Sequence, residues 1–303
     1  MKKKRNLIWL SVIILTFLAV ELFLRYYLGF GDAVLMMRND KYEYIAQPDQ
    51  DRFRFRNHIR YNSLSMRSAE PDTTSDIILG FGDSVINGSV MVDQDSLVTT
   101  LLSLMLTHST KKNMQVLNIS AGSWGPDNCY AYLKEKGGFN ARMIFLVASS
   151  HDAYDNMDFR KVVDHDKGYR STQYSLAVWE LLDRYVIPQI LDKPDFSNET
   201  PDKNKKRPFN SGFSDLKNYA RINNIPFFVY LHPDSTESRK RAFNSQGNEI
   251  IQYCKARDIN IVWSFDKNKK EDYRDIIHLM ESGHRNMAEV IHTEIINSLK
   301  IRN

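Results

Sequence analysis

Five short apolar segments, separated by segments with helical periodicity, constrain the fold of this chain more than any other feature. Each is rich in β-branched or aromatic residues, which is typical of buried strands. Strands that alternate with helices indicate a mostly parallel sheet covered on both faces. We therefore predict an α/β fold, a three-layer sandwich around a five-stranded sheet. The predicted strands are Asp76–Phe81, Gln115–Ile119, Met143–Ala148, Pro226–Leu231 and Asn260–Ser264, and the predicted helices are Asp95–Leu106, Asn128–Lys136, Ser214–Ile222, Gln246–Arg257 and Gly283–Leu299.

The N-terminus has the pattern of a membrane anchor. Leu7–Val20 is almost wholly apolar, and with the residues up to Tyr27 the segment reaches about 20 residues, the length that crosses a bilayer. The basic run Lys2–Arg5 predicts a cytoplasmic N-terminus and an extracytoplasmic body, in the periplasm or at the cell surface. No small-residue cleavage site follows the apolar segment, so we expect an uncleaved signal anchor over residues 1–30.

The rest of the chain divides into three predicted parts. Residues 31–72 are polar and aromatic with little periodicity, which favours an irregular stalk. The main domain then covers residues 73–303, interrupted by an insertion at about 159–212. The insertion contains a predicted helix, Ser175–Leu191, followed by a polar run that includes Lys203–Arg207. Such long loops are often lids or solvated segments.

Charge and cysteine content exclude several classes of function. Residues 1–30 account for the whole formal net charge of +4, so the remaining body is neutral and lacks the basic footprint of a nucleic-acid-binding protein. Within the anchor, Glu21 is expected to pair with Arg25 one turn later. Cys129 and Cys254 are the only cysteines. They could be joined or unpaired, and neither has metal-ligand spacing, so we predict neither a metal nor a cofactor.

Two short motifs far apart in the chain supply the parts of a nucleophilic catalyst. Ser84 follows the first predicted strand, at the sheet edge where open α/β folds keep their active sites. Asp275 and His278 stand three residues apart, just before the last predicted helix. A serine hydroxyl needs a base to remove its proton, and the base needs an acidic partner to hold its tautomer. We therefore predict Ser84 as nucleophile, His278 as base and Asp275 as its orienting carboxylate.

The chain contains four short sequence blocks: Gly82–Ser84, Asn118–Gly122, Ser149–Asp152 and Asp275–His278. Together they resemble the blocks of the SGNH/GDSL hydrolase superfamily, in a form similar to membrane-anchored bacterial members. The resemblance spans about residues 60–300 and implies an oxyanion hole made by the Ser84 amide, the Gly122 amide and a third donor. That donor is asparagine in the superfamily pattern and His151 in this chain.

Several further residues have two readings each. Trp124 follows the second block and could stack on a sugar ring or pack in the core. Asp152 and His232 follow predicted strands and are candidates for lining the substrate cleft. Asp83 is expected to bond turn amides, and His284 to be structural. A metal site is the minor alternative for the acidic and histidine side chains of His151, Asp152, Asp155, Asp164, His165 and Asp166.

These patterns together predict a membrane-anchored serine esterase. The expected substrate is an O-acyl ester, in particular an O-acetyl ester, on an envelope or exported carbohydrate. One alternative is a carbohydrate O-acyltransferase that uses the same triad. Another is a non-catalytic protein that binds glycan or an assembly partner. The helix Ser175–Leu191 also leaves lipase activity open.

Overall fold

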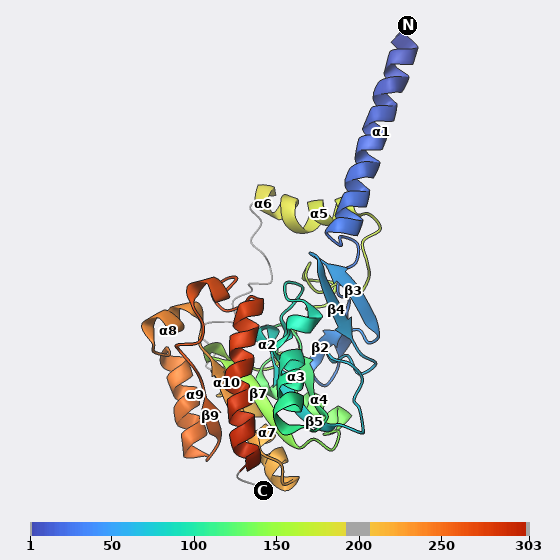
Figure 1. The fold of residues 1–303 in the computed structure, drawn as a ribbon. Coiled ribbons are helices and arrows are strands. Elements are labelled where there is room, and N and C mark those ends of the chain that lie inside the picture. The colour runs from blue at the N-terminus through green and yellow to red at the C-terminus, as the bar shows by residue number, and fades with distance from the viewer. Residues whose placement is uncertain (1, 192–206, 301–303) are drawn as a thin grey trace.

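The computed structural model describes residues 2–191 and 207–300 and shows a five-stranded, wholly parallel sheet (Figure 1). The strand order is β6-β5-β7-β8-β9, in which the first strand of the sheet lies between the second and the third. This confirms the predicted fold class, and each strand begins within one residue of its predicted start. The strands are β5 (Asp76–Gly82), β6 (Met114–Ser120), β7 (Met143–Ser149), β8 (Phe227–His232) and β9 (Asn260–Val262).

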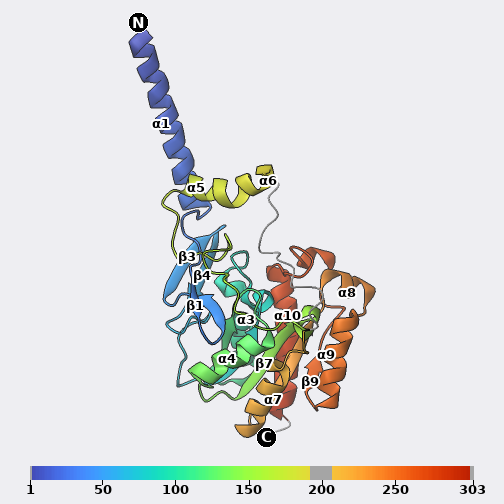
Figure 2. The same cartoon turned by 180° about the vertical axis from the view of Figure 1, so that it is seen from behind.

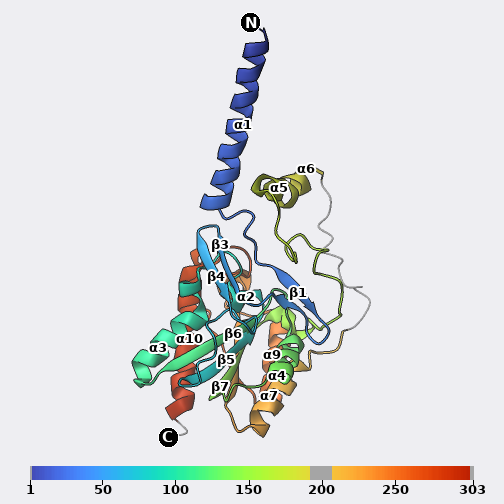
Figure 3. The ribbon, with the colours of Figure 1, turned by 90° about the vertical axis from the view of Figure 1, so that its right-hand side faces the viewer.

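Helices cover both faces of the sheet, as the alternation predicted (Figure 3). One face packs against α2 (Ser84–Asn87), α3 (Val98–Thr110) and α10 (Glu281–Lys300). The other face packs against α4 (Pro126–Lys136), α7 (Gly212–Ile222) and α9 (Ser245–Ala256). Cys129 and Cys254 lie in this second layer, both buried and both free. Short elements complete the domain: α8 (Ser235–Lys240) and the 3₁₀ turns η1 (Gln94–Ser96), η2 (Ser150–Ala153) and η5 (Lys270–Asp272).

The prediction of an irregular stalk after the anchor is wrong. The segment forms two antiparallel hairpins, and Tyr42, Ile45 and Ile59 pack into the same core cluster as the sheet. The turn of the second hairpin is Phe55–Arg56, where both residues have positive φ. Such turns favour Asn-Gly, so this pair gave no hairpin signal. The strands are β1 (Met36–Asn39), β2 (Glu43–Ala46), β3 (Gln50–Arg54) and β4 (Asn57–Tyr61).

The N-terminal helix α1 (Lys2–Tyr27) projects away from the domain (Figure 1). It is the one helix among the described residues that is long and apolar enough to cross a membrane, with a mean hydropathy of 2.6. That property suits a membrane anchor or a signal sequence. The expected pair is present: Arg25 Nη2 lies 2.8 Å from Glu21 Oε1.

The predicted helix of the insertion is present as one continuous rod beside the end of α1 (Figure 2). It consists of α5 (Ala177–Leu181), a π-helical turn η3 (Leu182–Val186) and α6 (Ile187–Leu191). Pro188 explains the irregular turn, because its ring clashes with a carbonyl one turn earlier. The polar run that follows lies largely outside the described residues.

Candidate active site

The structure brings together the two motifs that are farthest apart in the domain. His278 Nε2 lies 2.9 Å from Ser84 Oγ, although 194 positions separate the two residues. On the other side of the ring, His278 Nδ1 lies 2.8 Å from Asp275 Oδ2 and 3.0 Å from Oδ1. A carboxylate, an imidazole and a hydroxyl therefore form one hydrogen-bonded series at the carboxyl edge of the sheet.

The turn after β5 sets the position of Ser84. A Cβ at Gly82 would lie 2.7 Å from the Val147 carbonyl oxygen, so only glycine fits there. Asp83 caps α2, and its Oδ1 accepts a hydrogen bond of 2.8 Å from the Val85 amide, which is the role predicted for it. Ser84 is the first residue of α2, so its own amide has no partner within that helix.

Sequence reasoning missed Arg67, which holds the far end of α2. Its side chain is fully buried and donates to the carbonyls of Asn87, Ser89 and Val92. Burial lowers the pKa of this guanidinium. A buried cation that satisfies carbonyls at a helix end fixes the helix that carries Ser84. Arg67 is distant from Ser84 in the sequence, so only the three-dimensional structure reveals that it holds the helix that carries Ser84.

The loop that carries His278 is held by hydrogen bonds to the Asp275 carboxylate. Asp275 Oδ1 accepts hydrogen bonds from the amides of Ile277 (3.0 Å) and His278 (2.8 Å). Burial acts to raise the pKa of Asp275, but these amides and the His278 ring outweigh it and lower the pKa to about 2. The carboxylate is therefore charged at any ordinary pH, ready to orient the imidazole.

The prediction that His232 lines the substrate cleft is wrong. Its side chain is fully buried, and its Nε2 lies 2.9 Å from the Ile277 carbonyl oxygen. Burial lowers the pKa of His232 to about 4, so the ring is neutral and its Nε2–H donates to that carbonyl. His232 therefore supports the loop between Asp275 and His278 from below.

The other two predicted substrate contacts are also wrong. Trp124 is buried, and its Nε1 donates to the Tyr44 carbonyl at 2.9 Å, so neither ring face is open to a sugar. Asp152 is buried as well, and its Oδ2 accepts from the Ser149 amide at 2.6 Å to cap the turn after β7. Strand-end residues are as often structural as exposed, and the sequence does not separate the two.

Gly122 lies in the loop after β6, where its neighbours fix the backbone. Tyr44 Oη donates to the Gly122 carbonyl at 2.8 Å. A Cβ at Gly122 would lie 2.6 Å from the hydroxyl of Tyr169, so a side chain would displace that ring. The Gly122 backbone is therefore held firmly, as a preorganised donor requires.

His151 lies among carboxylates beside the nucleophile turn. Its side chain is 46% exposed, and Nε2 lies 3.7 Å from both Asp83 Oδ2 and Asp152 Oδ1. Partial burial opposes protonation, but Asp152 and Asp83 outweigh it and raise the pKa of His151. Burial in turn raises the pKa of both Asp83 and Asp152. One ligand atom from each of these three residues falls within 4.8 Å of the others, a spacing that could hold a metal ion.

The wider acidic and histidine region is not a cluster of this kind. Asp164 accepts from the Ser171 amide at 2.8 Å and from its hydroxyl, which closes a local turn. The prediction that the protein uses no metal stays a prediction.

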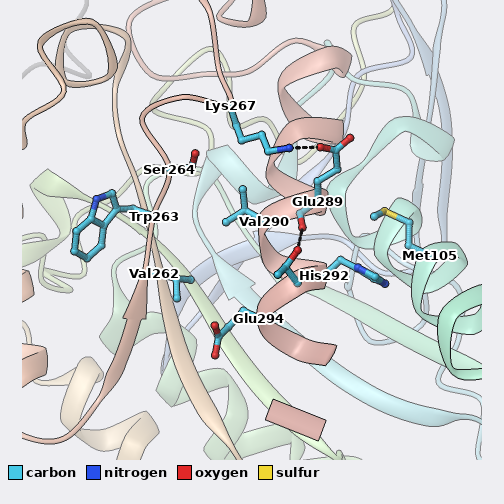
Figure 4. A pocket seen from close by; sticks show the side chains of 10 residues that line it. Met105, Val262, Trp263, Ser264, Lys267, Glu289, Val290, His292 and Glu294 are labelled. Carbon is cyan, nitrogen blue, oxygen red and sulfur yellow. Dashed lines mark hydrogen bonds and ion pairs between the residues drawn. The ribbon is translucent and has the colours of Figure 1, made fainter. Parts of the chain in front are cut away.

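A hollow of about 530 Å³ lies away from this site, between β9 and α10 (Figure 4). Across it, Lys267 Nζ lies 2.6 Å from Glu289 Oε2. The hollow is lined by none of Ser84, Asp275 and His278, so the proposed chemistry does not use it.

The buried His284 is structural, as predicted: its Nδ1 accepts from the Val98 amide at 3.2 Å. Burial lowers the pKa of His284 to about 3. In the unfolded chain His284 has an ordinary pKa near 6.5, so below that pH it is protonated in the unfolded state and remains neutral in the folded state. Stability is therefore unaffected above pH 6.5, and between pH 6.5 and 4.5 the His284 contribution falls by up to about 1.4 kcal/mol per pH unit.

We expect the thermal midpoint of the full chain in detergent to fall less steeply over this range in His284→Gln than in the wild type. The exposed His58→Gln is the matched control and should keep the wild-type slope. Equal slopes in wild type and His284→Gln would contradict a neutral, buried His284.

No protein-family profile and no curated protein matches the chain. Solved structures do match. One is a GDSL-like lipase from Bacteroides thetaiotaomicron, with 10% identity over 76% of this chain and 92% of the other, and a TM-score of 0.42. An esterase from Pseudoalteromonas shares 10% identity over 75% and 100% of the two chains, with a TM-score of 0.41. An acetyl xylan esterase shares 14% identity over 72% and 99%, with a TM-score of 0.38.

Proposed function

We propose that this protein is a serine ester hydrolase that acts through an acyl-Ser84 intermediate. The observation that carries the proposal is the hydrogen-bonded series Asp275–His278–Ser84, with 2.8 Å and 2.9 Å between its nearest atoms. The His278 ring is within reach of the hydroxyl proton, and the charged Asp275 holds the ring in the tautomer that can accept it.

The reaction follows from this geometry. Ser84 Oγ attacks the acyl carbonyl carbon while its proton passes to His278 Nε2. The tetrahedral intermediate then expels the alcohol, which leaves with the proton from His278. Water attacks the acyl-Ser84 ester, gives its proton to His278, and releases the acid, and the proton returns to Ser84.

The negative charge on the tetrahedral intermediate needs donors already in place. We assign the amides of Ser84 and Gly122 to this role, each worth about 3–4 kcal/mol in the transition state. His151 is the third donor, in the place of an asparagine. The neighbouring carboxylates raise its pKa. The ring has an N–H to donate whether it is neutral or protonated.

For the substrate, we propose an O-acyl ester, in particular an O-acetyl ester, of an extracytoplasmic carbohydrate. The helix α1, its basic N-terminal residues and the absence of an apparent cleavage site in the sequence support an anchored domain outside the cytoplasm. Acyl transfer to a sugar hydroxyl would use the same acyl-Ser84 and differ only in the acceptor.

The test is ester turnover by the full chain in detergent with p-nitrophenyl acetate, with and without an oligosaccharide. Hydrolysis predicts equal amounts of p-nitrophenol and acetate. An acetylated oligosaccharide detected by mass would assign transfer instead. Glycan binding without turnover of any ester would contradict both and indicate a binding protein.

In the same assay we expect Asp275→Asn to lower kcat by about 10³–10⁴-fold, because the amide no longer holds the productive tautomer. Asp266→Asn, an exposed aspartate paired with Arg241, is the control and should retain wild-type turnover. An Asp275→Asn variant with full activity would remove the carboxylate from the proposed mechanism.

A further inference from the structure

The helix of the insertion, residues 177–191, has the reverse polarity of a helix on a soluble domain. Its large apolar residues are exposed: Trp179 is 51% exposed and Ile190 is 72% exposed, and Leu182 is also open to the surroundings. Leu176, at the N-cap, is exposed as well, and Gln189 is the one exposed polar residue among the described side chains of the helix. Amphipathic helices of soluble proteins turn such residues inward. An apolar face turned outward over its length marks an interaction surface.

The charged residues of the same helix face the protein. Glu180 is fully buried and lies 2.7 Å from Arg54 Nη2 and 3.0 Å from Arg184 Nη1. It also accepts from the Gly31 amide at 2.6 Å. A buried, fully paired carboxylate resists rotation of the helix, because removing any partner leaves its charge uncompensated. The contacts of Glu180 therefore fix the orientation of the helix, with its apolar residues facing outward.

A second pair of charges has the same effect one turn later. Asp183 lies 2.7 Å from Lys167 Nζ and accepts from the Tyr174 hydroxyl at 2.6 Å. Both partners belong to the segment that leads into the helix. The polar side of the helix is thus held to the rest of the protein at Glu180 and Asp183, in its first half.

The insertion helix begins beside Glu21 and Arg25, near the C-terminal end of α1. Glu21 accepts from the amides of Ala177 (2.8 Å) and Val178 (2.9 Å), and Arg25 donates to the Ser175 carbonyl at 3.0 Å. Figures 1 and 2 show the helix crossing the end of α1 at a steep angle. The apolar stretch Leu7–Leu24 is about 27 Å long, close to the hydrocarbon thickness of a bilayer of about 30 Å. With α1 in a membrane, the helix therefore starts at the outer boundary of the hydrocarbon.

We infer that residues 177–191 form an in-plane membrane helix, with Leu176, Trp179 and Ile190 inserted into the outer leaflet of the bilayer that α1 crosses. This inference rests on the proposed anchoring by α1 and is independent of the ester chemistry. Its occupant is lipid, because the helix starts against Glu21, near the end of the apolar stretch of α1, and both helices expose large apolar side chains. Tryptophan suits this depth, since its ring is apolar and its N–H is polar.

The test is nitroxide accessibility in the full chain, reconstituted into phosphatidylethanolamine–phosphatidylglycerol vesicles. Cys129 and Cys254 are buried, so a label attaches to an introduced cysteine. Ile190→Cys is compared with Ile222→Cys, whose native isoleucine is equally exposed (73%) but lies on α7, at the opposite end of the domain from α1 (Figure 1). We expect the label at 190 to be relaxed by oxygen and shielded from a water-soluble nickel chelate, and the label at 222 to show the reverse.

Two further measurements in the same vesicles separate the possible failures. A label at Leu15→Cys reports whether α1 is in the bilayer. If it is, and the label at 190 is as open to nickel as the label at 222, the in-plane helix is refuted although the anchor stands. Equal nickel access at all three positions refutes both. Ester turnover by the same vesicles tests the proposed function separately: an inactive sample with a shielded label at 190 supports the in-plane helix and contradicts the hydrolase.

Discussion

Replacing Ser84 by alanine is expected to lower ester turnover by about 10⁴-fold or more, because the acyl-Ser84 intermediate can no longer form. His278 and Asp275 would remain in place but have no hydroxyl to activate. What activity remains would come from water positioned near His278 and from the oxyanion donors. Substrate binding should change little, since the hydroxyl contributes mainly to the transition state.

A serine-reactive phosphonate gives a direct measurement of the same prediction. Intact-mass analysis should show one adduct on the wild-type chain and none on Ser84→Ala. Ser214→Ala, a partly exposed serine on α7, is the control and should keep the adduct. An adduct that survives in Ser84→Ala would assign the nucleophile to another residue and refute the triad.

Replacing Arg67 by alanine is expected to lower the free energy of unfolding by about 3 kcal/mol or more. The change leaves the carbonyls of Asn87, Ser89 and Val92 without their donor, and each unsatisfied buried group costs about 1–3 kcal/mol. The loss falls at the end of α2, so turnover should also decline through displacement of Ser84. Lysine at this position should recover only part, because one ammonium cannot replace the planar fork of donors.

The shift in thermal midpoint of the full chain in detergent checks this expectation. Arg60→Ala is the matched control, because Arg60 and its partner Asp51 are mostly exposed and such pairs contribute about 0–1 kcal/mol. Equal midpoints for Arg67→Ala and Arg60→Ala would mean that the buried guanidinium does not hold α2.

The sequence was sufficient for the sheet because each strand is a short, nearly continuous apolar run between turn residues. It was sufficient for the grouping of Ser84, Asp275 and His278 because a serine, a histidine and an aspartate supply the nucleophile, base and orienting carboxylate of one mechanism. The sequence was insufficient where a structure depends on contacts between residues that are distant in the chain. The Phe55–Arg56 turn lacks the usual turn residues, so residues 31–72 seemed irregular although they pack in the core.

Buried polar residues were the other source of error. His232, Asp152 and Trp124 all sit at or near strand ends, where exposed catalytic residues also occur. Burial, and the partner that satisfies each polar atom, decide between the two roles, and neither is visible in one sequence. Arg67 is a further example: nothing in the sequence marks this arginine, but in the structure it is fully buried and donates to three carbonyls.

The hydrogen bonds from Glu21 and Arg25 to the start of α5 connect α1 rigidly to the domain, so that α1 is not a flexible linker. The turn that carries Ser84 lies on the side of the domain nearer α1, whereas α10 runs away from it toward the C-terminus (Figures 1 and 3). If α1 is fixed in a bilayer, this rigid connection holds Ser84 at a constant distance from the lipid surface. For the proposed hydrolase, this would limit turnover to esters that reach that distance from the lipid, and identical esters farther out would not be cleaved.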